Sequence, residues 1–272
     1  MFKGNERKEF IPQIIIDILL LSGIDYIKSL PEGQDVTIND IINYCEQESK
    51  KFGKDDINFE ELIRQAVSTG YDKRYFEIDD KAEERSAILN QFSESFMEIL
   101  KRLNIHETYR EQKVLVVGIG NGFEGKMLYA DINNLALADI APQSLAQAKK
   151  VLPQAKEYNE PADKLSSVFD DSYDLYISLR TYQSTYFDIP ASLQEAKRIL
   201  KNNGAIVISV ACGYLNAQNE FVYGLFNPHN GVFEENRPDV FLNTIRRHLR
   251  KLKFNIVGEM RIPTEVFIFA TL

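Results

Sequence analysis

From Lys113 onward, short runs of strand-forming residues alternate with amphipathic helical runs. The runs that predict strands are Val114–Val117, Leu135–Asp139, Ala155–Tyr158, Tyr173–Ser178, Ala205–Val210, Phe254–Met260 and Glu265–Ala270. The runs that predict helices are Gly122–Ala130, Pro142–Leu152, Ile189–Leu200 and Pro238–Leu252, and Gly204 is expected to stop the third of them. This alternation is typical of a parallel sheet built from βαβ units. It predicts an α/β fold around a seven-stranded, doubly wound sheet.

The last two predicted strands are joined by a short turn that contains Pro263. A short turn can connect only antiparallel neighbours, whereas the first five strands are separated by helical crossovers and are expected to be parallel. The sequence therefore predicts a Rossmann-like sheet with an antiparallel terminal strand pair. We expect this domain to occupy residues 109–272.

Residues 1–108 have a different hydrophobic pattern and predict a mainly helical N-terminal unit. Apolar residues recur at helical spacing within Phe10–Ile27 and again within Ala82–Leu103. The run Ile14–Leu21 is more apolar than a single exposed helix should be. We expect the unit to act as a lid over a ligand site or as the interface of a homodimer.

The charge balance bears on the kind of partner. The 272 residues include 32 basic and 40 acidic side chains, which give a formal net charge of -8. A protein that follows a phosphate backbone needs a basic surface, so this balance argues against nucleic acid. The basic cluster Arg246–Lys253 has the spacing of an ordinary solvated helix, and a nucleic-acid patch is the alternative.

Two further features concern location. The longest apolar run near the start contains Asp17 and is much shorter than the ~20 residues that a membrane span needs. The two cysteines, Cys45 and Cys212, lie far apart and lack metal-ligand spacing, which suits a reducing compartment. No export signal is recognised. The sequence thus predicts a cytoplasmic protein with no bound metal and no contact with a membrane.

A glycine-rich turn follows the first predicted strand and precedes a helix. Its residues are Gly118-Ile119-Gly120-Asn121-Gly122. Glycines permit a tight turn and let backbone amides approach a bound group near the start of a helix. The second strand ends in Asp139, which is 139 − 118 = 21 residues after the first glycine. In nucleoside-binding doubly wound folds an acidic residue at this spacing binds the ribose hydroxyls.

Four segments, in order, resemble the motifs of the class I S-adenosylmethionine-dependent methyltransferase family. They are VLVVGIGNG at 114–122, LADIAPQSL at 137–145, FDDSYDLYIS at 169–178 and EAKRILKNNG at 195–204. The resemblance covers residues 113–272 and implies an enzyme that uses S-adenosyl-L-methionine. A nicotinamide-dependent dehydrogenase is disfavoured, because Phe123 stands where the GxGxxG pattern requires its last glycine.

The resemblance also implies roles for particular residues. It places Gly118, Gly120 and Gly122 under the methionine part of the cofactor, Asp139 on the ribose diol and Ile140 against adenine.

In the segment after the third strand, Ala162 and Asp163 are implied at the adenine edge. One departure concerns the methionine end, where Val116 replaces the acidic residue that the family usually has two positions before the first glycine. Glu124 would compensate only if its backbone turned it inward.

The loop after the fourth strand should face the transferred methyl group, because ligands bind outside the carboxyl ends of the strands. Arg180 is a candidate for binding a substrate carboxylate or phosphate, and Tyr182 and Tyr186 for contacting a substrate ring. Packing of these residues on neighbouring helices is the alternative. His229, in the long segment between the fifth strand and the last helix, is a candidate general base, with an exposed turn residue as the alternative.

The sequence as a whole favours a methyltransferase that acts on a small-molecule substrate. The alternatives are an RNA methyltransferase that uses the basic cluster Arg246–Lys253, and a non-catalytic nucleoside-binding protein of the same fold. No Asn-Pro-Pro-Tyr or Asp-Pro-Pro-Tyr element follows the fourth strand. Its absence argues against methylation of DNA bases or of glutamine.

Overall fold

The computed structural model describes residues 86–120, 122, 124–182, 188–212 and 238–272, four short strands between residues 214 and 234, and eight residues of the N-terminal part. Those eight are Asn43, Glu46, Gln47, Lys50, Lys51, Asn58, Glu61 and Ser68. Most of the unit expected over residues 1–108 lies outside the described residues. Its role as a lid or dimer interface therefore stays a prediction.

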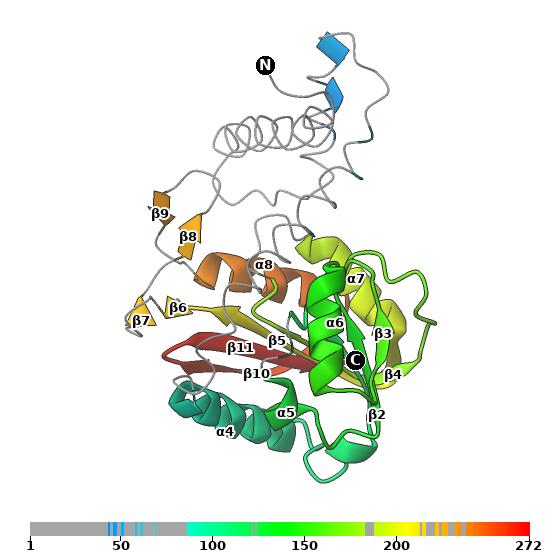
Figure 1. Cartoon of the computed structure of the whole chain (residues 1–272), viewed down its shortest axis with the longest axis vertical. Coiled ribbons are helices and arrows are strands. Elements are labelled where there is room, and N and C mark those ends of the chain that lie inside the picture. Colours follow the sequence, from blue (N-terminus) through cyan, green and yellow to red (C-terminus); the bar gives the residue numbers. More distant parts are fainter. Residues whose placement is uncertain are drawn as a thin grey trace.

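A seven-stranded sheet forms the centre of the described part (Figure 1). Its strands are β1 (Lys113–Val117), β2 (Asn134–Ala138), β3 (Lys156–Tyr158), β4 (Tyr173–Leu179), β5 (Leu200–Ala211), β10 (Asn255–Ile262) and β11 (Glu265–Thr271). Their order is β10-β11-β5-β4-β1-β2-β3. Strands β1 to β5 pair in parallel, and β11 runs antiparallel to both of its neighbours. The predicted sheet with its antiparallel terminal pair is confirmed.

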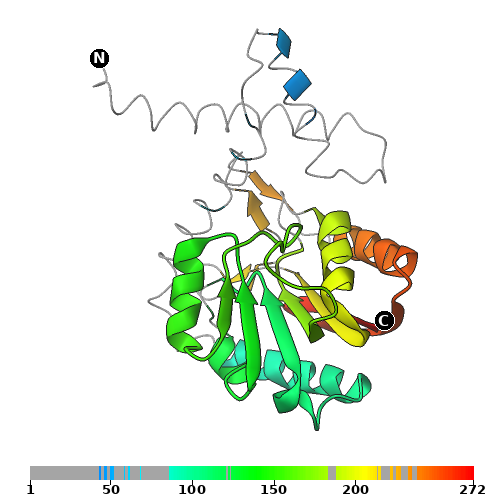
Figure 2. The same ribbon diagram turned by 90° about the vertical axis from the view of Figure 1, so that its right-hand side faces the viewer.

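Helices cover both faces of the sheet (Figure 1, Figure 2). One face carries α4 (Ser86–Arg102), α5 (Gly125–Leu128) and α6 (Pro142–Val151), and the other carries α7 (Ile189–Ile199) and α8 (Pro238–Lys251). Their apolar residues recur at helical spacing on the side that meets the sheet. In α8 these residues are Leu242, Ile245 and Leu249, all fully buried.

Helix α4 shares its apolar core with the sheet, although its residues precede the boundary predicted at residue 108. Phe92, Phe96, Ile99 and Leu100 are buried in one cluster with strand residues. The ring centroids of Phe92 and of Phe267 on β11 lie 5.2 Å apart. The helix therefore packs as a layer of the sheet domain.

The helix after the glycine-rich turn is shorter than predicted, since α5 begins at Gly125 and not at Gly122. Gly118, Gly120 and Gly122 have φ values of 72°, 56° and 75°. A right-handed helix needs negative φ, so the turn must be completed before the helix can start.

The structure corrects the prediction that Gly204 stops a helix. Helix α7 ends at Ile199, and β5 begins directly at Leu200 and runs through Gly204. The pairing of β4 with β5 is irregular here, because Tyr173 pairs with Leu200 and Leu175 pairs with Ala205. A Cβ at Gly204 would lie 2.9 Å from the carbonyl oxygen of Lys201. Gly204 therefore lies where the strand pairing is irregular and where a side chain would not fit.

Two connections complete the domain. Residues 159–172 join β3 to β4 through turns without a helix, unlike the helical crossover that was expected between these strands. The long segment after β5 contains four short strands, β6 (Tyr214–Leu215), β7 (Phe221–Val222), β8 (Leu225–Asn227) and β9 (Val232–Glu234). They form two antiparallel pairs, β6 with β7 and β8 with β9. Within the described residues, none of the helices has the length and apolar character to span a membrane.

Candidate functional site

The order of the strands creates a switch point beside β1. The chain leaves β1 toward β2 on one side, whereas β4 joins β1 on the other side. In open α/β sheets, ligands bind at the carboxyl ends of the strands at such a point. The glycine-rich turn follows β1, Asp139 follows β2, and Arg180 follows β4. The topology therefore brings these predicted site residues to one edge of the sheet.

The first and third glycines of the turn are required by close packing as well as by their backbone conformation. A Cβ at Gly118 would lie 2.1 Å from Oγ1 of Thr181, which follows Arg180 in the loop after β4. A Cβ at Gly122 would lie 2.8 Å from Cα of Ala148 on α6. Gly118 thus lets the loops after β1 and β4 meet, and Gly122 lets the turn approach α6.

Asp139 holds the glycine-rich turn in place. Its Oδ2 accepts a hydrogen bond from the backbone N–H of Gly120 at 2.9 Å, and its Oδ1 accepts one from the N–H of Ala141 at 2.9 Å. The residue is 8% exposed. Each oxygen of a carboxylate has two lone pairs and can accept more than one hydrogen bond. The carboxylate therefore suits a ligand that offers two hydroxyl groups beside the turn.

Asn159, which the sequence did not single out, joins the loops after β2 and β3. Its side-chain Nδ2 donates to the carbonyl oxygens of Asp139 at 2.9 Å and of Ile140 at 3.1 Å. Ile140 is half-buried beside this junction. An Asn directly after a strand is a weak sequence signal, because Asn is common in turns of every kind.

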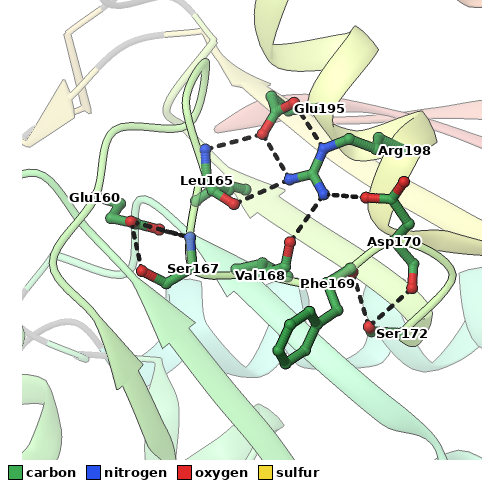
Figure 3. Close-up of polar contacts among 9 residues, drawn as sticks. All are labelled: Glu160, Leu165, Ser167, Val168, Phe169, Asp170, Ser172, Glu195 and Arg198. Carbon is green, nitrogen blue, oxygen red and sulfur yellow. Dashed lines mark hydrogen bonds and ion pairs between the residues drawn. The ribbon is translucent and has the colours of Figure 1, made fainter.

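Ala162 and Asp163 lie in the connection between β3 and β4, and Arg198 of α7 anchors this connection. Figure 3 shows the Arg198 guanidinium among groups of the connection. It donates to the carbonyl oxygens of Leu165 at 2.9 Å and of Val168 at 2.8 Å.

Two carboxylates complete the anchor. Arg198 pairs with Asp170 at 2.5 Å and with Glu195 at 2.8 Å. Glu195 also accepts from the N–H of Leu165 at 2.9 Å. The hydrogen bond from Arg198 is the main cause that lowers the pKa of Glu195. The connection that carries the adenine-edge candidates is thus fixed to α7 by charged groups.

Arg180 is engaged within the protein. Its Nε and Nη2 donate to Oε1 of Glu265, at 3.0 and 2.6 Å, and its guanidinium carbon lies 5.5 Å from the centroid of the Phe92 ring. Arg180 has a φ of 57°, and its N–H bonds to the carbonyl oxygen of Ser209 at 3.0 Å. Glu265 is fully buried at the start of β11.

Glu124 lies directly after the glycine-rich turn and is partly buried. Burial raises the pKa of its carboxyl group, the nearby charge of Arg180 lowers it, and the charge of Glu265 adds a smaller rise. Glu124, Arg180 and Glu265 therefore interact electrostatically, although they come from three separate segments. The sequence had named Glu124 only as a residue that could replace the acidic group missing at Val116, and Val116 itself is 2% exposed within the apolar core.

Of the two candidate tyrosines in the loop after β4, the structure describes Tyr182 and does not describe Tyr186. Tyr182 is fully buried in the core beside Tyr176, and their hydroxyl oxygens lie 3.3 Å apart. This placement favours the packing alternative for Tyr182. Tyr186 lies outside the described residues, as does His229, the candidate general base.

Neither of the two main surface hollows coincides with this edge. They measure about 650 and 550 Å³, share Asp171 and Asn202 in their linings, and lie at the start of β4 and β5. None of the predicted site residues lines them. Within the described residues, no group of three or more His, Cys, Asp or Glu side chains is arranged to hold a metal ion.

The fold defines the chain as a doubly wound α/β protein. Its glycine-rich turn after β1 is tied to a carboxylate after β2, an arrangement that is typical of nucleoside-binding proteins of this fold. Comparison with known proteins narrows the class. Residues 115–208 match a family described as a methyltransferase domain. Over these residues the chain is therefore similar to a methyltransferase domain, in agreement with the resemblance that the sequence motifs indicated. No curated protein matches the sequence.

The chain is also similar to solved structures. A putative sarcosine dimethylglycine methyltransferase from Galdieria sulphuraria is 12% identical with a TM-score of 0.50, and the match covers 74% of this chain and 98% of that one. A SAM-dependent methyltransferase from Aquifex aeolicus is 16% identical with a TM-score of 0.46, covering 64% and 87%. A 1,6-didemethyltoxoflavin-N1-methyltransferase from Burkholderia thailandensis is 17% identical with a TM-score of 0.46, covering 78% and 88%. At 12% identity, the likeness to the first of these structures shows a shared fold and nothing more.

Proposed function

We propose that the chain is an S-adenosylmethionine-dependent methyltransferase that acts on a small molecule, with the nucleoside part of the cofactor held at the carboxyl edge of β1 and β2. The observation that carries the cofactor site is the placement of Asp139, whose carboxylate lies against the N–H of Gly120. A carboxylate can accept hydrogen bonds from both hydroxyls of a ribose. The half-buried Ile140 beside Asp139 supplies an apolar surface for adenine.

The cofactor supplies an activated methyl group on a sulfonium centre, so the protein needs to bind, orient and shield the reactants. Asp139 holds the turn that carries the backbone N–H groups, and Asn159 holds Asp139 and Ile140. The apolar core beneath the edge, which includes Val116 and Leu179, excludes water from below. His229 remains the proposed general base for the acceptor atom.

The charge distribution supports a small molecule over RNA. The net charge is -8, and the first arginine of the basic cluster, Arg246, is held by Glu259. Both oxygens of Glu259 accept hydrogen bonds from this guanidinium, at 2.5 and 2.7 Å. An arginine engaged in this way offers less charge to a phosphate backbone. The cytoplasmic location and the homodimer through the N-terminal unit stay predictions from the sequence.

The experiment follows the methyl group. The full chain is incubated with S-adenosylmethionine labelled on the methyl group, once with total cellular RNA and once with the low-mass fraction of a cell extract. We expect the label to enter the low-mass fraction only, and the variant Gly120→Val to transfer none, since its side chain would block the backbone at the turn. Transfer of label into RNA, with binding that weakens steeply as salt rises, would show the RNA alternative to be right.

A further inference from the structure

Glu265 presents an unused hydrogen-bond acceptor at the carboxyl edge of the sheet. Two nitrogens of Arg180, Nε and Nη2, donate to the same oxygen, Oε1. The other oxygen, Oε2, is buried and has no hydrogen-bond partner among the residues that the structure describes. A buried polar atom without a partner destabilises the folded protein, and native structures rarely contain one. The arrangement therefore suits a donor that arrives with a ligand.

The pair formed by Arg180 and Glu265 borders the glycine-rich turn. Arg180 follows β4, which lies beside β1 at the usual strand spacing of ~4.8 Å. Thr181, the next residue, donates from Oγ1 to the carbonyl oxygen of Gly118 at 3.5 Å. The charge of Arg180 also acts on Glu124 at the other end of the turn. A ligand that lies along this turn comes within reach of the pair.

The chemistry of the pair matches one end of the cofactor. S-Adenosylmethionine carries an α-amino acid group, in which a cationic ammonium and an anionic carboxylate sit on the same carbon. Glu265 offers an acceptor to the ammonium, and the Arg180 side chain, 41% exposed, offers donors to the carboxylate. The side chain of Val116 offers no carboxylate for this role, because it is apolar and buried.

We propose that Arg180 and Glu265 bind the amino-acid end of the cofactor, with Oε2 of Glu265 accepting a hydrogen bond from the ammonium and Arg180 donating to the carboxylate. Because Glu265 is fully buried, Arg180 turns partly aside when the ligand enters. This assignment rests on the proposed cofactor site. In this proposal the amino-acid end is bound by residues of the loop after β4 and the start of β11, and not by a residue at the end of β1.

The test compares two ligands by calorimetry with the full chain. S-Adenosylhomocysteine has the nucleoside and the amino-acid end, whereas 5′-methylthioadenosine has the nucleoside and lacks that end. We expect the parent protein to bind the first at least about 10-fold more tightly. Glu265→Gln should lower the affinity for S-adenosylhomocysteine by about 10-fold or more and change the affinity for 5′-methylthioadenosine by no more than about twofold. The matched control is Glu259→Gln on the neighbouring strand β10. This change removes the charge that pairs with Arg246 of α8 and should alter neither affinity.

Two results would overturn the assignment. Equal affinity of the parent protein for both ligands would exclude a bound amino-acid end, whether or not Glu265→Gln folds. Equal weakening of both ligands by Glu265→Gln would show that the residue acts through the fold alone. Binding of 5′-methylthioadenosine without a preference thus contradicts only this assignment, whereas no binding of either ligand to the folded parent contradicts the proposed function itself.

Discussion

Asp139 has two roles that the sequence could not separate. The spacing of 21 residues from Gly118 marked it as a ligand for ribose hydroxyls, and the structure shows that it also accepts hydrogen bonds from Gly120 and Ala141. A carboxylate that organises the turn before a ligand arrives reduces the ordering cost of binding. We therefore expect the same side chain to contribute both to the stability of the turn and to the affinity for the ligand.

Replacing Asp139 with Ala should weaken S-adenosylhomocysteine binding by about 5- to 150-fold, which corresponds to ~1–3 kcal/mol for ribose hydroxyls left unpaired. It should also lower the free energy of unfolding, because two backbone N–H groups lose their acceptor. Calorimetry measures the affinity and urea unfolding measures the stability. Asp131→Ala, which removes an exposed partner of Arg110, is the control. Unchanged affinity in Asp139→Ala would mean that the ligand does not contact this carboxylate.

The raised pKa of Glu124 predicts a pH-dependent stability. Because burial raises the pKa above the ordinary value of 4.5, the folded state holds the proton more tightly than the unfolded state does. The contribution of Glu124 to the free energy of unfolding therefore falls as the pH rises from below 4.5 through the folded pKa.

The isosteric variant Glu124→Gln lacks this titration. Its free energy of unfolding should rise relative to the parent as the pH increases from about 4 to 8, and the two should converge at the acidic end. Urea unfolding of both proteins across that range is the measurement. A difference that does not depend on pH would show that Glu124 has an ordinary pKa in the folded protein.

At the scale of elements, the connection between β3 and β4 shows how a loop without a helix is fixed in place. Arg198 on α7 contacts two carbonyl oxygens and two carboxylates around it, as Figure 3 shows. The connection holds Ala162 and Asp163, and it begins at Asn159. We therefore expect the fixed conformation of this connection to depend on the guanidinium of Arg198.

Arg198→Met should leave the carbonyl oxygens of Leu165 and Val168 without this donor and lower the free energy of unfolding by ~1–3 kcal/mol near neutral pH. Amide hydrogen exchange should speed up in residues 159–172 before it does so elsewhere. Arg110→Met is the control, because within the described part of the chain Arg110 forms its ion pair with the exposed Asp131. Unaltered exchange in 159–172 would contradict the anchoring role.

The effect of Arg198→Met should also depend on pH. The hydrogen bond from Arg198 lowers the pKa of Glu195 below 4.5, so this pair stabilises the fold above the unfolded pKa and loses its effect as the pH falls through the folded value. The destabilisation should therefore shrink in acid. Urea unfolding at about pH 3 and pH 7 tests the difference.

At the scale of the whole molecule, local patterns predicted the fold well. Alternating apolar runs marked all seven strands of the sheet, and the short turn at Pro263 marked the antiparallel pair. The missed boundaries have local causes, such as the positive φ values that delay α5 and the irregular pairing at Gly204.

The contacts of the site could not be predicted from the sequence as well as the fold, because they join segments that are far apart along the chain. Arg180 and Glu265 are 85 residues apart, and Asn159 meets Asp139 across 20. No spacing rule links such residues. The burial of Tyr182 likewise depends on how the loop after β4 turns back onto the core, which an aromatic side chain in a polar loop does not indicate.

The central claim is that the carboxyl edge of this sheet binds S-adenosylmethionine. Calorimetry of the full, folded chain with S-adenosylmethionine and with S-adenosylhomocysteine tests it most directly. We predict that both ligands bind one site with dissociation constants at or below about 100 μM, and that Gly120→Val abolishes both. Absence of heat from either ligand at several times that concentration, in protein whose cooperative unfolding has been verified, would contradict the account.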